Sequence, residues 1–279
     1  MNDRVTVDIQ GGVADVRLVR ADKMNALDTA MFSALIETGE RLKTEPGVRA
    51  VVLSGEGRAF CAGLDMGNFQ SMASGERSGG KGTAGDLLTP NRTPGGANRA
   101  QHACMVWREI PVPVIAAVHG VAFGGGCQLA LGADVRLIAP DARMSVMEIK
   151  WGLVPDMAGM VLMRGLVRDD VARELTYTGR IVTGEEAVAV GLATRVAADP
   201  RAEALTLARD IAGRNPHAIQ AGKRLLNLMS HADQHQILLE ESREQAALIG
   251  SSNQVEAVMA NLQKREPNFA DVTPAKADA

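Results

Sequence analysis

Two carboxylates separated by a short loop are the residues of this sequence best suited to proton chemistry. Glu148 and Asp156 lie in the segment MEIKWGLVPDMAG, with Gly152 and Pro155 between them. Such a loop can fold back and bring both side chains into one pocket, where burial raises the pKa of a carboxyl group towards the range useful for proton transfer. The pattern alone favours the alternative, in which both are solvated loop residues or caps for a helix expected from Ala158.

Two glycine segments could bind the oxygen on which negative charge develops. Residues 62–64 (Ala-Gly-Leu) and 124–126 (Gly-Gly-Gly) each follow an apolar stretch that is typical of a buried strand. In a layered fold both could lie at one edge of the core and direct a backbone N–H at a common point, because glycine places no side chain in the way. Two converging N–H groups make an oxyanion hole. The alternative, two ordinary tight turns, fits the spacing equally well.

Single residues argue against nucleotide binding by these glycines and against a metalloprotease zinc site at the histidines. The dinucleotide-binding pattern would need glycine where Phe60 stands, and no Lys-Ser or Lys-Thr pair follows the triple glycine as in a nucleotide-phosphate loop. His231 and His235 have helical spacing, but a metalloprotease helix would need glutamate at the position of Ala232. We therefore expect no metal among the site residues.

The elements that must position these groups are organised around residues 110–133, which carry no charge. The stretch is long enough to span a membrane, but Pro111, Pro113 and its glycines would break a spanning helix. We interpret it as a buried strand over residues 112–118, a turn over residues 120–126 and a helix from Cys127 onward.

The remaining pattern predicts an α/β core followed by helices. Residues 5–18 alternate around two glycines as in a β-hairpin, and Asp28 is a good N-cap for the helix after it. Further strands are expected over residues 48–53, 134–138, 143–146 and 192–196. The expected division is a core of residues 1–199, a helical region of residues 200–265 and a frayed polar tail of residues 266–279. Residues 67–98 are either a lid over a ligand or an insertion without a role.

Composition narrows the setting of the protein. A net charge of -3 gives no electrostatic footprint for nucleic acid or for an anionic membrane. The sequence has three cysteines, Cys61, Cys104 and Cys127, and no Cys-x-x-Cys pair, which favours a reducing compartment. Its first residues show no apolar stretch typical of a secretion signal. Cys61 and Cys127 flank the glycine segments without an evident base to activate them. We expect a cytoplasmic protein without nucleic-acid or membrane partners.

Several motifs occur in a fixed order along the chain. They are MNAL at residues 24–27, RAFCAGLDM at 58–66, PVIAAVHGVAFGGGCQLALGADVRLIA at 113–139, MEIKWGLVPDMAG at 147–159, TGRIVTGEEAVAVGL at 178–192 and the ending LQKREPNF. From about residue 5 to Phe269 the chain thus resembles the crotonase superfamily of enoyl-CoA hydratases and isomerases. The resemblance implies an α/β crotonase-like spiral of repeated ββα units with a C-terminal helical region for trimerisation, and hence a homotrimer or a hexamer of two trimers. It also implies an acyl-CoA thioester as substrate and no separate cofactor, since coenzyme A is part of the substrate.

The same resemblance assigns roles to individual residues. The oxyanion donors would be the N–H groups of Leu64 and Gly125, and the catalytic side chains would be Glu148, Asp156 and Gln128. The residues expected to line the CoA and substrate pocket are Lys23, Met24, Ala26, Ala62, Gly63, Leu64, Asp65, Met66, Gly124 and Gly125.

One departure from the family pattern bears on the reaction. Family hydratases carry glutamates at both positions that match Gln128 and Glu148. In this chain the first of these positions carries an amide, which can hold a water molecule but cannot give or take a proton at neutral pH. Asp156 stands where dienoyl-CoA isomerases carry an acidic residue. The prediction is therefore double-bond isomerisation, with Glu148 as base and Asp156 as proton shuttle. The alternatives are an enoyl-CoA hydratase, which adds water in syn fashion to a 2-enoyl-CoA, and a non-catalytic acyl-CoA-binding homologue.

Overall fold

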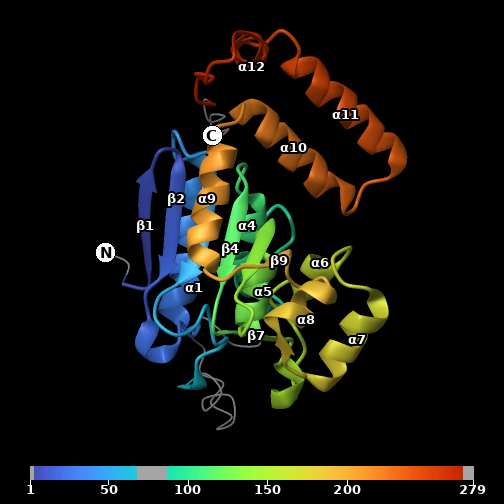
Figure 1. The fold of residues 1–279 in the computed structure, drawn as a ribbon. Helices are drawn as coiled ribbons and strands as arrows, with labels where there is room; N and C mark the ends of the chain where they lie inside the picture. Colours follow the sequence, from blue (N-terminus) through green and yellow to red (C-terminus); the bar gives the residue numbers. More distant parts are fainter. Residues whose placement is uncertain (1–2, 68–86, 273–279) are drawn as a thin grey trace.

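Two β-sheets form the framework of the protein in the computed structural model, which describes residues 3–67 and 87–272 (Figure 1). The larger sheet has the order β1-β2-β3-β4-β6-β9 and the smaller one the order β5-β7-β8. The strands of the larger sheet are β1 (Val5–Gln10), β2 (Val13–Leu18), β3 (Ala50–Gly55), β4 (Val114–Val118), β6 (Val135–Ile138) and β9 (Arg195–Val196). Those of the smaller sheet are β5 (Val121–Phe123), β7 (Arg143–Ser145) and β8 (Val182–Thr183). β1 and β2 pair antiparallel, which confirms the predicted hairpin.

The chain passes repeatedly from the larger sheet to the smaller one and then into a helix. β4 is followed by β5 and α5 (Gly125–Leu131), and β6 is followed by β7, the 3-10 helix η2 (Glu148–Trp151), α6 (Gly159–Met163) and α7 (Asp169–Thr178). The chain after β3 takes the same course, since Cys61 forms a parallel bridge with Ala122 before α4 (Arg99–Glu109) begins. This course is the predicted repetition of ββα units.

The turn predicted over residues 120–126 is wrong. Strand β5 lies within it and pairs in parallel with β7, and α5 begins at Gly125 rather than at Cys127. A Cβ atom on Gly126 would lie 2.2 Å from the backbone oxygen of Cys61. This glycine therefore allows the start of a helix to pack closely against an earlier loop, which a glycine pattern alone does not distinguish from a turn.

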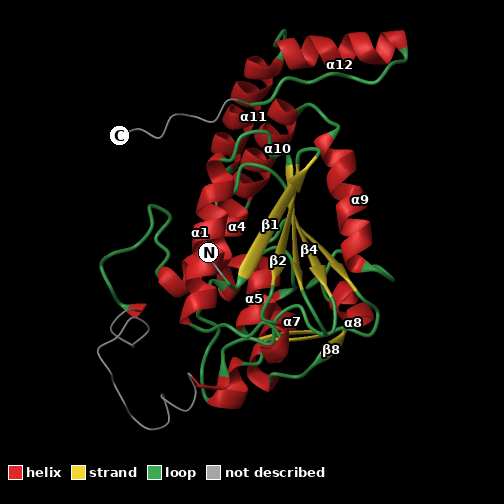
Figure 2. Cartoon of the chain, turned by 90° about the vertical axis from the view of Figure 1, so that its left-hand side faces the viewer, coloured by secondary structure: helices red, strands yellow, loops and turns green. Residues whose placement is uncertain are grey.

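Helices cover both faces of the larger sheet (Figure 2). On one face lie α4 and α1 (Thr29–Thr44), which begins as predicted with the Asp28 carboxylate accepting the Met31 N–H at 2.8 Å. On the other face, α9 (Pro200–Ala212) packs Ala204 and Ala208 against a cluster that includes Val52. α9 starts directly after residue 199 and shares a core with earlier residues, so the division of the chain into domains stays a prediction.

Helix α7 has no counterpart among the predicted elements. Val171, Ala172 and Leu175 of this helix lie against the core, and Asp169 and Asp170 stand in its first turn, so the sequence carried both an apolar stripe and a start signal that the sequence analysis missed. α8 (Gly184–Ala189) begins at a cap, because Thr183 accepts the N–H of Glu186. The spacing of Thr183 and Glu186 in the sequence is typical of a capping box. The Glu186 carboxylate, however, pairs with Arg180.

The C-terminal helices α10 (Pro216–Met229), α11 (Gln234–Leu248) and α12 (Ser252–Gln263) extend beyond the sheets (Figure 1). No residue of α11 is buried. Large apolar side chains exposed on these helices are Leu226, Met229, Leu238, Leu239, Val255, Val258, Met259 and Leu262. Across the described ranges, no helix has both the length and the apolar character needed to cross a bilayer.

Two predicted segments fall partly outside the described residues. These are residues 68–86 of the segment considered as a lid or an insertion, and residues 273–279 of the predicted tail. The fraying predicted for the tail is wrong for its described part. Arg49 donates to the Asp271 carboxylate at 2.7 Å and to the Phe269 carbonyl at 2.8 Å, and Asn253 donates to the Ala270 carbonyl at 2.8 Å. Polar side chains of the folded chain thus hold this backbone in place.

A buried lysine fastens α10 to the larger sheet through an ion pair with an exposed aspartate. Lys223 is 5% exposed, and its Nζ donates to the Asp134 carboxylate at 2.7 Å and to the Val112 carbonyl at 2.8 Å. Because Lys223→Met removes hydrogen bonds from a charged donor but leaves Asp134 in contact with solvent, we expect it to lower the free energy of unfolding by about 2 kcal/mol. Urea unfolding measures the change, with the exposed Lys264→Met as control. A loss below about 1 kcal/mol would mean that the pair contributes no more than a surface one.

Candidate active site

The two glycine segments singled out in the sequence lie side by side. Cys61 and Ala122 form a parallel bridge, and the N–H of Phe123 donates to the Cys61 carbonyl at 3.1 Å. A Cβ atom on Gly63 would lie 2.5 Å from the Phe123 oxygen and 3.6 Å from the backbone nitrogen of Gly125. Gly63 also has a φ of +88°. Glycine is therefore required for the two segments to approach this closely.

The backbone N–H groups of Leu64 and Gly125 lie at this contact. The N–H of Leu27 donates to the Gly63 carbonyl, and the Leu27 carbonyl accepts the N–H of Asp65. In this parallel pairing the N–H of Leu64, which lies between them, points away from Leu27. Gly125 is the first residue of α5, where an N–H has no partner within the helix. Throughout the described part of the chain, neither N–H has a hydrogen-bond acceptor. Two adjacent free donors suit an oxygen that gains negative charge.

Glu148 is buried beside these donors, at the start of η2. A Cβ atom on Gly124 would lie 3.3 Å from its Oε1, which places the carboxylate over the beginning of α5. Its Oε2 is buried without a hydrogen-bond partner among residues 3–67 and 87–272. Burial raises the pKa of Glu148, a hydrogen bond from Gln128 opposes the rise, and the charge of Asp156 adds to it. The result is a carboxylate with one unengaged oxygen and an increased affinity for a proton.

Gln128 of α5 holds this carboxylate in position. Its Nε2 donates to Oε1 of Glu148 at 2.7 Å, while its Oε1 accepts the N–H groups of Met157 at 2.9 Å and Gly159 at 2.8 Å. Both lone pairs of the amide oxygen are thus engaged. The sequence suggested that Gln128 could hold a water molecule, but the structure leaves its oxygen no lone pair for one.

Asp156 lies in the loop between η2 and α6, which folds back towards α5. Its charge raises the pKa of Glu148, so the two carboxylates interact across the site. Neighbouring protein atoms partly desolvate the Asp156 carboxyl group and raise its pKa, although the residue as a whole is exposed. Glu148 is thus buried, as the first of the two arrangements considered from the sequence requires, whereas Asp156 is exposed, as in the alternative.

The segments expected to bind CoA, residues 23–26 and 62–66, also lie next to each other. The N–H of Ala62 donates to the Met24 carbonyl at 2.9 Å, and the Asp65 carboxylate accepts from Arg20 at 2.6 Å. Among the other predicted lining residues, Lys23 and Met66 are exposed, and Ala26, Gly63 and Gly125 are buried. The structure thus places residues 23–27 beside residues 62–65, the segment that carries the N–H of Leu64.

Asn25 is a supporting residue that the sequence analysis missed. It is fully buried, has a φ of +55°, and donates to the Glu56 carbonyl at 3.0 Å and the Ala59 carbonyl at 2.8 Å. Its Oδ1 accepts the N–H of Arg20 at 2.9 Å. Asparagine adopts left-handed backbone conformations more readily than most residues, and this was the available signal in the segment MNAL.

The histidines and cysteines noted in the sequence supply neither a metal site on a helix nor a reactive thiol. His231 precedes α11 rather than lying on it, so the predicted helical spacing of His231 and His235 does not exist. Cys61 and Cys127 are buried, and burial raises the pKa of each thiol to about 12, which keeps both protonated and unreactive at neutral pH.

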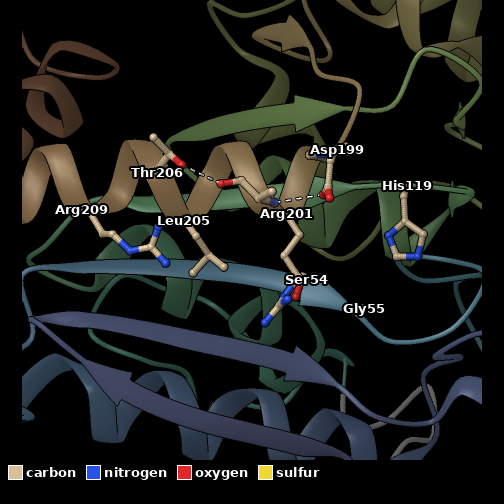
Figure 3. Close-up of a pocket in the computed structure, with 10 residues that line it drawn as sticks. Ser54, Gly55, His119, Asp199, Arg201, Leu205, Thr206 and Arg209 are labelled. Atoms are coloured by element: carbon tan, nitrogen blue, oxygen red, sulfur yellow. Dashed lines mark hydrogen bonds between the residues drawn. The ribbon is translucent and has the colours of Figure 1, made fainter.

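A cavity of about 530 Å³ lies away from these groups, between α9 and the ends of β3 and β4 (Figure 3). Its lining includes Ser54, Gly55, His119, Asp199, Arg201, Leu205, Thr206 and Arg209, and none of the predicted site residues. Asp199 caps α9 by accepting the Ala202 N–H, and Arg201 pairs with Asp15, so both serve the fold. We place the candidate active site at the paired N–H groups and Glu148, because there polar groups without partners converge.

Comparisons with known proteins agree over nearly the whole chain. A family model described as enoyl-CoA hydratase/isomerase matches residues 8–272. A putative enoyl-CoA hydratase of Thermus thermophilus is 31% identical, with 93% of this chain and 98% of the relative covered. A peroxisomal Delta(3,5)-Delta(2,4)-dienoyl-CoA isomerase of Arabidopsis thaliana is 30% identical, with 90% of each chain covered.

A solved structure supports the same comparison. The crystal structure of a putative enoyl-CoA hydratase from Streptomyces coelicolor aligns with a TM-score of 0.86 and 31% identity, covering 97% of this chain and 95% of that one. The sheets and helices described above, including the C-terminal ones, therefore follow the fold of that protein.

Proposed function

Because the chain belongs to the enoyl-CoA hydratase/isomerase family, we propose that it moves a double bond within an enoyl-CoA thioester. The predicted family, the crotonase-like fold and the assignment as a hydratase/isomerase enzyme are confirmed by the comparisons. Relatives of similar identity are named hydratases and dienoyl-CoA isomerases. The choice between these reactions therefore depends on the site.

In the proposed reaction, the thioester carbonyl oxygen accepts the N–H groups of Leu64 and Gly125. Negative charge drawn onto that oxygen weakens the C2–H bond, so the Oε2 of Glu148 can remove the proton. As the C2–H bond breaks, its electrons form the C2=C3 double bond of the product, the C3=C4 bond becomes single, and Asp156 delivers a proton to C4. The exposed Asp156 then regains a proton and Glu148 releases the one it took up, which restores both groups for the next turnover. The neighbouring segments, residues 23–26 and 62–66, bind CoA, and no separate cofactor takes part.

The observation that carries this proposal is the hydrogen bonding of Gln128. A hydratase must hold and activate a water molecule, which in this family takes two glutamates. Here the second position carries an amide whose oxygen is engaged by Met157 and Gly159. One carboxylate with an unengaged oxygen and a second one nearby support transfer of a proton between carbons rather than addition of water.

Hydration is the second candidate, since relatives of up to 31% identity bear that name. The two reactions are separated by incubating the purified protein with a 3-enoyl-CoA and, separately, with crotonyl-CoA. We expect conversion of the first to a 2-enoyl-CoA and slow or no hydration of the second. Rapid hydration without a double-bond shift would reverse this order. Tight binding of both without turnover would indicate an acyl-CoA-binding homologue.

The pH dependence of kcat/KM is expected to be bell-shaped. Glu148 must be ionised to act, and its raised pKa makes activity fall as the pH drops through a value above the ordinary 4.5. Asp156 must be protonated to donate, so activity also falls as the pH rises through its raised pKa. Asp156→Asn should abolish the alkaline limb together with most turnover. An acid limb centred at or below 4.5 would contradict the role of Glu148.

We further propose that the protein assembles as a homotrimer, or as a hexamer of two trimers. Two separate apolar surfaces support this proposal: the exposed side chains of α10–α12 and a second set formed by Ile149, Trp151, Leu153, Val154, Met160 and Val161. Contact between unlike surfaces of neighbouring copies closes into a ring. Light scattering should give a mass of three or six chains, and Leu262→Asp should shift the distribution towards monomers. A wild-type monomer would refute the assembly.

A further inference from the structure

A polar cluster lies between α1 and α4, away from the candidate active site. The two helices approach closely because Gly39 has no side chain: a Cβ atom there would lie 2.5 Å from Cγ2 of Val106. His102 and Glu109 lie on either side of Val106 along α4, and Glu40 and Lys43 of α1 face them. The helix contact thus brings four polar side chains together.

Lys43 provides the positive charge of this cluster. Its Nζ lies 2.8 Å from Oε1 of Glu40 and 2.7 Å from Oε2 of Glu109. Two carboxylates therefore share one ammonium, which leaves an excess of negative charge. The Lys43 side chain is 24% exposed, so its ammonium can move out into solvent without dismantling the helix contact.

His102 adds a ligand atom of another kind. Its Nε2 lies 2.7 Å from Oε1 of Glu40, and because a carboxylate there only accepts, Nε2 carries the proton. The lone pair of the neutral ring is then on Nδ1, which is buried and has no partner in the described part of the chain. The His102 side chain is 9% exposed, and Nδ1 lies 4.0 Å from Oε2 of Glu109. A buried imidazole nitrogen thus faces a carboxylate with nothing to bridge them.

We propose that one divalent metal ion of the zinc class binds here, between Nδ1 of His102 and the carboxylate of Glu109, and displaces the Lys43 ammonium. Ligand atoms of Glu40, His102 and Glu109 lie within 4.8 Å of one another. An imidazole nitrogen with carboxylate oxygens and water is a ligand set that zinc accepts. Glu40, which receives the Nε2–H, orients the ring, as carboxylates do behind metal-bound histidines.

The site links α1 to α4 and takes no part in the proposed reaction. Both proposed ligands, His102 and Glu109, lie on α4, and Glu40 of α1 supplies the hydrogen bond that orients the His102 ring. No metal was predicted from the sequence because only the spacing of His231 and His235 was considered there. Because the ion binds the packed pair of helices, it stabilises the folded state in proportion to its free concentration.

Zinc titration of the chelator-treated full-length protein tests the proposal. We expect one zinc ion per chain by calorimetry and a melting temperature that rises with zinc. His102→Gln should weaken binding by at least about tenfold. Lys43→Met should tighten it by about threefold, because the competing ammonium is gone. The matched control is His235→Gln, which removes an exposed helical histidine and should bind like the wild type.

Several results would overturn the site. The first is that neither the wild type nor Lys43→Met binds zinc stoichiometrically. The second is that His102→Gln binds zinc as tightly as the wild type. The third is that His235→Gln loses as much zinc affinity as His102→Gln. Turnover of enoyl-CoA serves as a folding check, since none of these residues belongs to the candidate active site. The comparison of Lys43→Met with the wild type decides the matter even if His102→Gln fails to fold.

Discussion

Glu148→Gln is expected to lower kcat for enoyl-CoA isomerisation by about 10²- to 10⁴-fold. Glutamine keeps the shape of the side chain and can still accept the hydrogen bond from Gln128, but it cannot take up a proton. KM should change little, because the substrate is bound by backbone N–H groups. Steady-state assays with a 3-enoyl-CoA measure the effect, with Glu241→Gln on the exposed face of α11 as control. Activity within about tenfold of the wild type would exclude Glu148 as the base.

The same substitution is expected to stabilise the fold at neutral pH. Burial raises the pKa of Glu148 above the ordinary 4.5, so the folded wild type carries an ionised group in an unfavourable place. That cost is fully present above the folded-state pKa and vanishes as the pH falls below the unfolded-state value. Glu148→Gln should thus be more stable than the wild type near pH 7 and lose this advantage at about pH 4. Urea unfolding at the two pH values provides the measurement, and a parallel loss of stability and activity would contradict it.

Gly63→Ala is expected to reduce kcat/KM by at least about 100-fold. The added methyl group would lie 2.5 Å from the backbone oxygen of Phe123, at a φ of +88° that alanine rarely adopts. Neither a backbone oxygen nor the chain around it can yield easily, so the N–H of Leu64 should move away from that of Gly125. The loss should therefore appear as weaker stabilisation of the developing charge, although Glu148 is unchanged.

Two further glycine variants separate this effect from backbone strain. Gly165→Ala carries the same kind of strain, since Gly165 has a φ of +76°, but its Cβ would meet nothing within 4 Å. Gly125→Ala would meet the flexible ends of Met157 and Leu27, at 2.7 Å and 2.8 Å, which can shift. We expect near-normal activity in the first and an intermediate loss in the second. Equal losses in Gly63→Ala and Gly165→Ala would show that strain alone is responsible.

Local patterns were sufficient to predict most elements of the fold. Alternation around paired glycines predicted the β1–β2 hairpin, and Asp28 marked the start of α1, because these signals act within a few residues. β5 was not predicted, since a strand of three residues exists through its pairing with β7 and not through its own pattern. α7 was missed although Val171 and Leu175 stand four residues apart and two aspartates fall in its first turn; with only ten residues, its apolar stripe is short.

The candidate site was predictable in its parts but not in its connections. Glycines after apolar stretches indicated where free N–H groups would lie, and the loop around Pro155 indicated that two carboxylates could meet. The engagement of the Gln128 oxygen depends on backbone N–H groups of Met157 and Gly159, and no side-chain pattern records them. Resemblance to a family supplied the substrate class, which geometry alone would not.

The hydrogen bonds of Gln128 also bear on redesign of this enzyme. One amide joins the backbone of the Asp156 loop to the carboxylate of Glu148, so loop conformation and base strength are not independent variables. A graft that replaces residues 153–159 to admit longer or bulkier acyl chains would displace the N–H groups of Met157 and Gly159. The Gln128 side-chain amide, whose oxygen accepts both, would then be free to rotate. Changes of substrate range made in this loop will therefore alter the proton affinity of the base, and successful grafts will have to keep the N–H groups that hold Gln128.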